Sequence, residues 1–313
     1  MGNEITELSF KTRALWGKVA VDGTHRWMPL WLHLSDTAEI SALLWQYWLP
    51  SHTKKIIAQG FDLTTSISLT ERMQYVEKVI RFLAAVHDCG KAEPAFVVKA
   101  EKVGFRDVVN DISEKGLPIH VKNLALAKQF PHSLVGEYIL ENMGVDRSLA
   151  DIIGAHHGKP PDSAEEILRV DVYSDLTGVG DLQWCFVQRE LVNYALKVSG
   201  LKELPKITIT VPVQVILSGL LIMADWIASD EFKFSLILRD YGLDAIESSA
   251  IRAKTAWNDL RFPIYKQFAS DCPWKYLYKK RFNCQPRSMQ VHALNVALNM
   301  KHPGLMVIEA PSL

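Results

Sequence analysis

Histidine and aspartate residues occur in this chain at places where ordinary solvent-exposed side chains are not expected. His87-Asp88 and His156-His157 each close an apolar helical stretch, and Asp225 lies inside the most apolar stretch of the chain. A strongly polar side chain in such surroundings is costly unless it is paired or binds a metal. Imidazoles together with carboxylates suit divalent transition metals. The pattern therefore predicts a metal centre.

Two further histidines, His33 and His132, lie just before predicted helices and extend this set. Asp88 has two carboxylate oxygens and can bridge two ions. Two ions about 3.5–4 Å apart can hold a phosphodiester, generate hydroxide near neutral pH and stabilise the leaving oxygen. Ligands drawn from different helix ends would build such a site inside a helical bundle. The predicted ligands are His33, His87, Asp88, His132, His156, His157 and Asp225.

Each of these residues also has an ordinary structural explanation. His33 could be structural, and His87-Asp88 could form a hydrogen-bonded pair at a helix end. His156 could lie at a helix C-terminus because a cation there interacts favourably with the helix dipole. Asp225 could be a buried, hydrogen-bonded carboxylate without a metal. The alternatives stay open at this stage, and the apolar context of the whole set favours the metal centre.

Composition limits the class of protein. The chain has 313 residues, 48% of them hydrophobic, and a formal net charge of zero, which argues against coating of duplex DNA through bulk positive charge. The N-terminus has no apolar signal region, and we expect no membrane association because no stretch approaches ~20 apolar residues. The four cysteines form no CxxC pair. A reducing cytoplasm is the expected compartment.

Apolar periodicity predicts helices over most of the chain. The predicted helices span 37–49 with Asp36 as the cap, 71–88 with Gly90 at its C-terminal end, 133–142, 147–157 with Asp146 as the cap, and 212–228. The predicted domains are a helical domain at 1–265, a basic and aromatic linker at 266–282, and a further fragment at 283–313.

Five motifs together resemble a known family. They are HxxDTA at 33–38, HDCGK at 87–91, PHSLVGE at 131–137, AHHG at 155–158 and ADWIAS at 224–229. This order is similar to the HD phosphohydrolase superfamily, and more narrowly to the HD nuclease domain of the type I CRISPR-associated helicase-nuclease. The resemblance implies an all-α, HD-type helical bundle followed by a short fragment of an α/β helicase domain.

The same resemblance assigns roles to the matching residues. One ion would be held by His33, His87, Asp88 and Asp225, and a second by Asp88, His132, His156 and His157. Lys91 would point at the scissile phosphate and balance charge in the transition state, so Asp88 and Lys91 are the expected catalytic residues. The family uses transition metals of the iron, manganese, nickel or cobalt class, and the sequence does not choose among them.

The C-terminal fragment is similar to the start of a superfamily 2 helicase. Residues 286–290 resemble the adenine-reading Q motif, with Gln290 as the reader, and residues 307–311 resemble the strand that enters the phosphate-binding loop. The Gly-rich loop that should follow is missing before Leu313. ATP hydrolysis is therefore not assigned to this chain, and ATP is expected only in a full-length helicase context.

The resemblance implies a metal-dependent deoxyribonuclease that cleaves single-stranded DNA in CRISPR antiviral defence, recruited by an RNA-guided surveillance complex. A basic and aromatic segment could stack bases and track phosphates, although a solvated linker explains it as well; the candidates are Trp274, Lys275, Lys279, Lys280 and Arg281. Two alternatives are a phosphohydrolase of nucleotides or cyclic dinucleotides and a non-catalytic docking fragment. Because imidazoles bind metals only when neutral, metal affinity is expected to fall below about pH 6.

Overall fold

The computed structural model describes residues 8–63, 67–158, 169–239, 246–260, 274–300 and 306–308. Contacts between residues divide the chain into two units, Met1–Leu260 and Arg261–Leu313. The first unit is the predicted all-α, HD-type helical bundle, and it carries every expected metal ligand. The predicted boundary at 265/266 and the first part of the linker, 266–273, lie outside the described residues.

The first unit consists of helices joined by short turns, with one small sheet. Its helices are α1 (Phe10–Ala14), α2 (Leu30–Leu43), α3 (Ser51–Gln59), α4 (Leu69–Val86), α5 (Pro94–Val97), α6 (Arg106–Glu114), α7 (His132–Asn142), α8 (Arg147–Gly154), α10 (Ser174–Thr177), α11 (Leu182–Ser199), α12 (Val211–Ala228) and α13 (Ser249–Asp259). One short π-helix, η2 (Leu44–Trp48), continues α2. Short 3₁₀-helices are η3 (Cys89–Lys91), η4 (Val98–Val103) and η5 (Leu124–Gln129). The strands are β1 (Trp16–Val19), β2 (Arg26–Pro29) and β3 (Ile237–Leu238).

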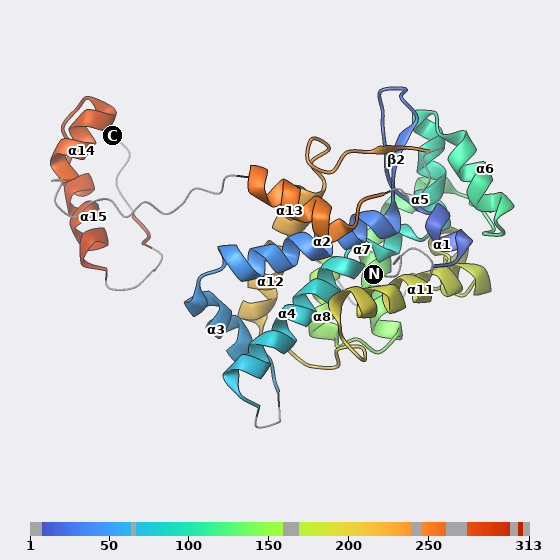
Figure 1. The fold of residues 1–313 in the computed structure, drawn as a ribbon, viewed down its shortest axis with the longest axis horizontal. Helices are drawn as coiled ribbons and strands as arrows, with labels where there is room; N and C mark the ends of the chain where they lie inside the picture. The colour runs from blue at the N-terminus through green and yellow to red at the C-terminus, as the bar shows by residue number, and fades with distance from the viewer. Residues whose placement is uncertain are drawn as a thin grey trace. The chain divides into compact units, whose positions relative to one another are not determined.

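Helix α2 is the centre of the bundle. It packs against α4, α12 and α13, and α4 packs in turn against α11 (Figure 1). Nearly every residue of α2 is buried, including Leu30, Leu34 and Ile40. A helix that is buried on nearly all sides lies in the core of a protein, so α2 offers a rigid position for the polar side chains it carries, among them His33 and Asp36.

The prediction of a helix at 37–49 capped by Asp36 is wrong at its start. The helix α2 begins seven residues earlier, at Leu30, because the apolar run continues through 30–34. Asp36 lies fully buried inside this helix, where Arg252 of α13 binds both of its carboxylate oxygens at 3.0–3.2 Å. Burial raises the pKa of Asp36, although the Arg252 guanidinium opposes this shift. This ion pair therefore fixes α13 on α2, one turn from His33.

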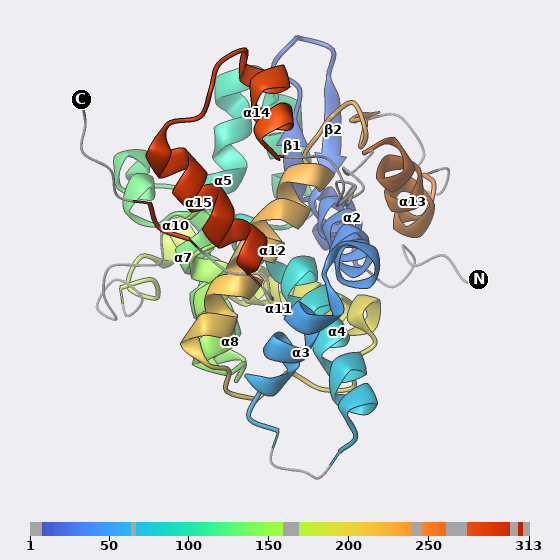
Figure 2. The same ribbon diagram turned by 90° about the vertical axis from the view of Figure 1, so that its left-hand side faces the viewer.

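Other helices begin where the sequence indicates. The Asp146 side chain accepts a hydrogen bond from the backbone of Ser148 at the start of α8, as a cap should. Helix α12 begins at Val211 with proline in its first turn. It is long and apolar enough to cross a membrane, a property that a core helix also has. Since α12 packs against α2 and α8, it is part of the bundle (Figure 2).

A three-stranded sheet, which was not predicted from the sequence, accompanies the helices. Strand β2 lies between β1 and β3, and both pairings are antiparallel. The β1–β2 hairpin turns through Gly23 and His25, both of which have positive φ. Strand β1 leads the chain past the beginning of α2, because Gly17 lies close against Leu30 and His33.

The second unit contains α14 (Trp274–Phe282) and α15 (Ser288–Asn299). Residues 274–282 of the predicted linker are therefore helical. The Gln290 side chain accepts a hydrogen bond from the backbone of Arg287 and so caps α15. The apolar residues 305–308 were expected to begin the strand that continues into 307–311, but no strand is formed over the described residues, 306–308. A β-strand needs a neighbour to pair its backbone groups, and these three residues have none among the described part of the chain.

The buried pair between Asp36 and Arg252 leads to a stability prediction. Replacing Arg252 by Ala should lower the free energy of unfolding by about 3–5 kcal/mol, because it leaves the buried Asp36 carboxylate without its cationic partner. Chemical denaturation measures this loss. The control is Arg26→Ala, which removes the exposed pair with Asp22 and should leave stability almost unchanged. Equal losses in the two variants would show that the buried pair has no special role.

Candidate metal centre

Five separate stretches of the chain converge in the first unit. Each stretch contributes one or two polar side chains, which lie on a helix or on the turn that follows a helix. The positions are His33 on α2, His87 and Asp88 after α4, His132 at the first residue of α7, His156 and His157 after α8, and Asp225 on α12. The structure thus brings all seven predicted ligands together, and they form two groups that share Asp88. Their binding of metal stays a prediction.

The first group surrounds one oxygen of Asp88. The Nε2 atom of His33 lies 3.3 Å from Asp88 Oδ2 and 3.2 Å from Asp225 Oδ1. The Nε2 atom of His87 lies 3.4 Å from each of the same two oxygens. Two nitrogens and two oxygens therefore face a common centre. Both rings are buried, with exposures of 1% and 0%.

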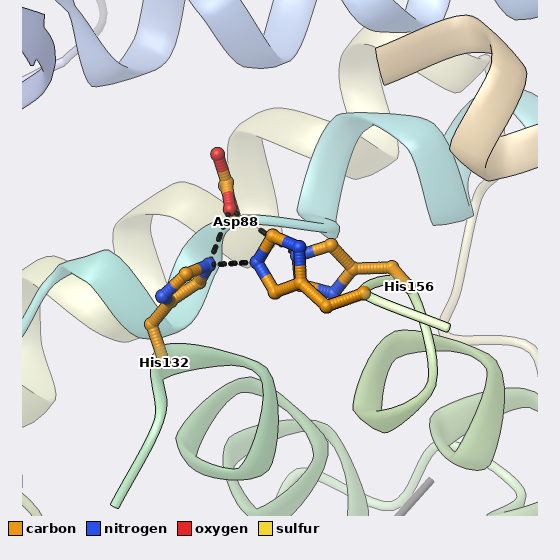
Figure 3. Close-up of side chains that lie close together, drawn as sticks. Asp88, His132 and His156 are labelled. Carbon is orange, nitrogen blue, oxygen red and sulfur yellow. Dashed lines mark hydrogen bonds and ion pairs between the residues drawn. The ribbon is translucent and has the colours of Figure 1, made fainter. Parts of the chain in front are cut away.

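The second group surrounds the other oxygen of Asp88. His132 Nε2 lies 3.1 Å from Asp88 Oδ1, and His156 Nε2 lies 3.5 Å from it. His157 Nε2 lies 2.8 Å from His132 Nε2. Figure 3 shows the Asp88 carboxylate facing the rings of His132 and His156. One carboxylate thus offers one oxygen to each group, which is the arrangement that a bridging ligand needs.

The spacing of these atoms fits metal ions. Atoms that bind one ion at about 2.1 Å lie about 3.0–3.4 Å from one another when they are octahedral or tetrahedral neighbours. The observed separations in the two groups run from 2.8 to 3.5 Å. Hydrogen bonds alone do not explain this packing, because His33 Nε2, His87 Nε2 and His156 Nε2 are buried and make no aligned hydrogen bond to any described residue.

Backbone carbonyls orient two of the imidazoles. His87 Nδ1 lies 2.8 Å from the carbonyl oxygen of Ala84, and His156 Nδ1 lies 2.6 Å from that of Ile153. A carbonyl can only accept, so each Nδ1 is protonated and donates. In a neutral ring Nε2 then carries a lone pair that faces carboxylate oxygens. A cation between them is required, and it is either a metal ion or an added proton.

The protonation of the site without metal follows from its charges. Burial lowers the pKa of His87, but the carboxylates of Asp88 and Asp225 outweigh burial and raise it to about 10. Burial raises the pKa of Asp88, but Lys91 and His87 outweigh it and hold this pKa well below its usual value. Burial lowers the pKa of His132 to about 4. His87 therefore carries a proton at neutral pH, whereas His132 is neutral and ready to bind a metal.

Gly90 allows the turn after α4 to approach α7. A Cβ atom at this position would lie 1.9 Å from the carbonyl oxygen of His132 and 2.6 Å from the backbone nitrogen of Gly136. No side chain fits in that space. Gly90 was predicted at the C-terminal cap of the helix before it, but α4 ends at Val86 with His87 as its cap, and Gly90 lies within the short turn η3. Its role is to let Asp88 reach His132.

Three further polar side chains border the site. Lys91 Nζ lies 2.6 Å from Asp88 Oδ2 and donates to the carbonyl oxygen of Gly17 at 3.2 Å. Ser229 donates to Asp225 at 2.9 Å. Lys18 on β1 interacts electrostatically with Asp225, Lys91 and Asp88, and its burial lowers its pKa. Lys18 was not predicted from the sequence, because a single lysine in a strand has no distinguishing spacing.

The remaining predicted residues belong to the second unit. Lys279, Lys280 and Arg281 are exposed on α14, and the side chains of Trp274 and Lys275 lie outside the described residues. Gln290 is exposed on α15. Their roles in binding DNA or nucleotide stay predictions. His25, His52, His120 and His292, which the sequence left outside the centre, are exposed.

A family model and a related protein of known sequence both point to the same family. The model described as "Cas3, HD domain" matches residues 16–234. A CRISPR-associated nuclease/helicase Cas3 of Streptococcus thermophilus is 33% identical over 300 residues, which are 91% of this chain and 31% of that protein. The chain therefore spans about a third of the length of this curated relative.

Solved structures share the fold. A crystal structure described as a CRISPR-associated protein has a TM-score of 0.67 and 26% identity, and the match covers 93% of this chain and 31% of that one. The Thermus thermophilus cas3 HD domain, crystallised in the presence of Ni²⁺, has a TM-score of 0.51 and 23% identity, with 82% of this chain and 93% of that chain covered. The second likeness concerns the fold alone.

The protonation of His87 predicts that metal uptake releases a proton. Because the pKa of His87 is about 10 without metal, a metal at the first group must displace this proton at every pH below that value. Affinity should fall roughly tenfold per pH unit over this range, well above the limit of pH 6 expected from an ordinary histidine. Calorimetry with Mn²⁺ in two buffers of different ionisation enthalpy measures the proton released.

The His157→Gln variant is the matched control. Burial and the neighbouring His156 lower the pKa of His157, so its ring has no proton to lose at neutral pH. This variant should weaken binding at the second group and leave the released proton unchanged. Identical heats in the two buffers for the unmodified protein would contradict the assigned protonation.

Proposed function

The chain belongs to the Cas3 HD-domain family, and from that premise we propose that it hydrolyses phosphodiester bonds of single-stranded DNA as the nuclease part of a CRISPR-associated system. The observation that carries this proposal is the carboxylate of Asp88, whose two oxygens belong to two different groups of ligands. A pair of adjacent metal ions is a recurrent device for phosphodiester chemistry.

The donor atoms support the choice of metal. Five imidazoles and two carboxylates suit ions of the iron, manganese, cobalt or nickel class better than Mg²⁺, which prefers oxygen ligands. We propose two ions, the first at His33, His87, Asp88 and Asp225 and the second at Asp88, His132, His156 and His157. When bound, such ions withdraw charge from a phosphate and lower the pKa of a water molecule.

The exposure of the ligands indicates how substrate reaches the site. His33, His87 and His156 are buried, whereas His157 is exposed and the side chain of Asp225 is 15% exposed, so these last two residues define the accessible rim of the site. A phosphate must therefore approach from the side of the rim. A phosphodiester that must reach partly buried ligands is least obstructed when no complementary strand accompanies it, which favours single-stranded DNA.

Two lysines at the rim supply positive charge for the phosphate. Burial and the nearby Lys91 ammonium lower the pKa of Lys18, so the two side chains are close enough to interact. The Lys91 ammonium already neutralises Asp88. With metal on that carboxylate, Lys91 is free to bind a non-bridging phosphate oxygen and to balance charge as it develops in the transition state.

The wider context is also part of the proposal. A protein of this fold is present in a structure described as a CRISPR RNA-guided surveillance complex, which supports a similar complex as the partner that recruits this chain. Cys89, Cys185 and Cys284 are unpaired thiols, in keeping with the cytoplasm as the compartment. ATP enters only for a longer protein with a complete helicase domain.

The first test of the proposal is loss of the shared carboxylate. Asp88→Ala should reduce cleavage of circular single-stranded DNA in Mn²⁺ or Co²⁺ by about a thousandfold, because about 4 kcal/mol of metal stabilisation is lost. The control Asp107→Asn removes an exposed carboxylate on α6 that pairs with Arg239 and should change the rate little. Undiminished cleavage by the Asp88 variant would refute the proposal. Hydrolysis of nucleotides without cleavage of DNA would point to the alternative phosphohydrolase.

The second test concerns Lys18. Lys18→Ala should raise KM for single-stranded DNA about three- to tenfold through the loss of one phosphate contact, with metal content and kcat nearly unchanged. Lys202→Ala, which removes an exposed lysine that borders a different pocket, is the control. A parallel fall in kcat and metal content would assign Lys18 a structural role instead.

A further inference from the structure

Three carboxylates meet between α7 and α8, outside the histidine centre. Glu137 and Glu141 lie one helical turn apart on α7, and Asp151 faces them from α8. One oxygen of each lies within 4.8 Å of one oxygen of each of the others. Ligands of a single Ca²⁺ ion, bound at about 2.3–2.6 Å, are separated by distances up to this scale. The three oxygens can therefore reach one ion.

The deepest of the three carboxylates lacks a complete set of partners. Glu137 is 1% exposed, and its Oε2 atom makes no hydrogen bond to a described residue. Burial, together with the charges of Asp151 and Glu141, raises the pKa of Glu137 to about 8. A buried carboxylate normally has a full set of hydrogen bonds or a positive partner, so this one requires an explanation.

Neighbouring polar groups neutralise only part of the charge. Arg147 lies 3.6 Å from Glu141 and 3.7 Å from Asp151, on the exposed side of the group. The Gln214 side chain donates to Asp151 at 3.3 Å. Three carboxylates and one guanidinium leave a formal charge of minus two when all are ionised. A single divalent cation would balance this charge.

The chemistry of this group differs from that of the histidine centre. All of its donors are carboxylate oxygens, which suit hard cations such as Ca²⁺ and Mg²⁺, whereas imidazoles suit transition metals. Glu137 lies five residues after His132, and Asp151 lies five residues before His156. At 1.5 Å per residue, the two sites are about 7–8 Å apart along each helix. They are thus separate but share the same pair of helices.

We propose that Glu137, Glu141 and Asp151 bind one hard divalent cation, of the Ca²⁺ or Mg²⁺ class, that fastens α7 to α8. Glu141 and Asp151 are half-exposed, so an ion can enter from solvent and reach Glu137. The ends of these two helices position His132, His156 and His157. The cation would therefore hold together the elements that build the second group of the histidine centre, without itself touching a substrate.

The competing occupant is a proton. Glu137 is able to hold one and to share it with Asp151 as a neutral acid. Glu137→Gln imitates that neutral acid in shape and charge. If a proton is the true occupant, this variant should behave like the unmodified protein toward added cations. If a cation is the occupant, the variant loses a ligand.

Calorimetry with CaCl₂ at pH 8.5 distinguishes the two occupants. The unmodified chain and Asp88→Ala should each bind one Ca²⁺ with equal affinity, because Asp88→Ala disables only the histidine centre. Glu137→Gln and the less buried Asp151→Asn should bind Ca²⁺ at least about tenfold more weakly, and the rise in melting temperature with Ca²⁺ should be lost in both. Asp111→Asn, on a helix-surface carboxylate paired with Lys115 and Arg239, should bind normally.

Two results would overturn the proposal. One is the absence of Ca²⁺ and Mg²⁺ binding by the unmodified chain at millimolar concentration. The other is binding that persists in both Glu137→Gln and Asp151→Asn. Neither result affects the proposed nuclease, whose test is cleavage of DNA with a transition metal, so the two proposals fail independently.

Discussion

The structure depends on one electrostatic constraint: five imidazoles and two carboxylates occupy a single buried region around Asp88. Lone pairs and negative charges that face one another repel, and they repel more strongly where water is excluded. Only cations between them make the arrangement favourable. The bundle must hold these groups in place when the cations leave, and it is the packing of the surrounding apolar helices that supplies the necessary stability.

The fold meets this constraint by fixing each ligand through a contact outside the site. Backbone carbonyls orient His87 and His156, Gly90 brings the turn after α4 against α7, and the buried Asp36–Arg252 pair fastens α13 on the helix that carries His33. The rings therefore lose little conformational entropy when metal binds, because their positions are already set. Removal of one of these contacts is expected to loosen a ligand without changing its chemistry.

Features with a local signal could be predicted from the sequence, and features created by distant contacts could not. Asp146 caps its helix as predicted, since a cap depends on neighbours two or three residues away. Asp36 has the same local appearance but is held by Arg252, 216 positions later. Tertiary packing thus overrode the local preference. Lys18 was missed for the same reason, because only the folded chain places its strand beside Asp225.

The two groups of ligands are unequal in their access to solvent, and this inequality has a chemical consequence. His33 and His87 are shielded on all sides, whereas the other group includes exposed His157 and partly exposed His132. In the first group only Asp225 is partly exposed, so an ion held there would lie in a largely enclosed site. An ion held by the second group would lie closer to water, and access to water is the property that separates a catalytic metal site from a structural one. Under the proposed nuclease activity, the phosphate would therefore meet the second group first, and the first group would serve mainly to fix the shared carboxylate of Asp88.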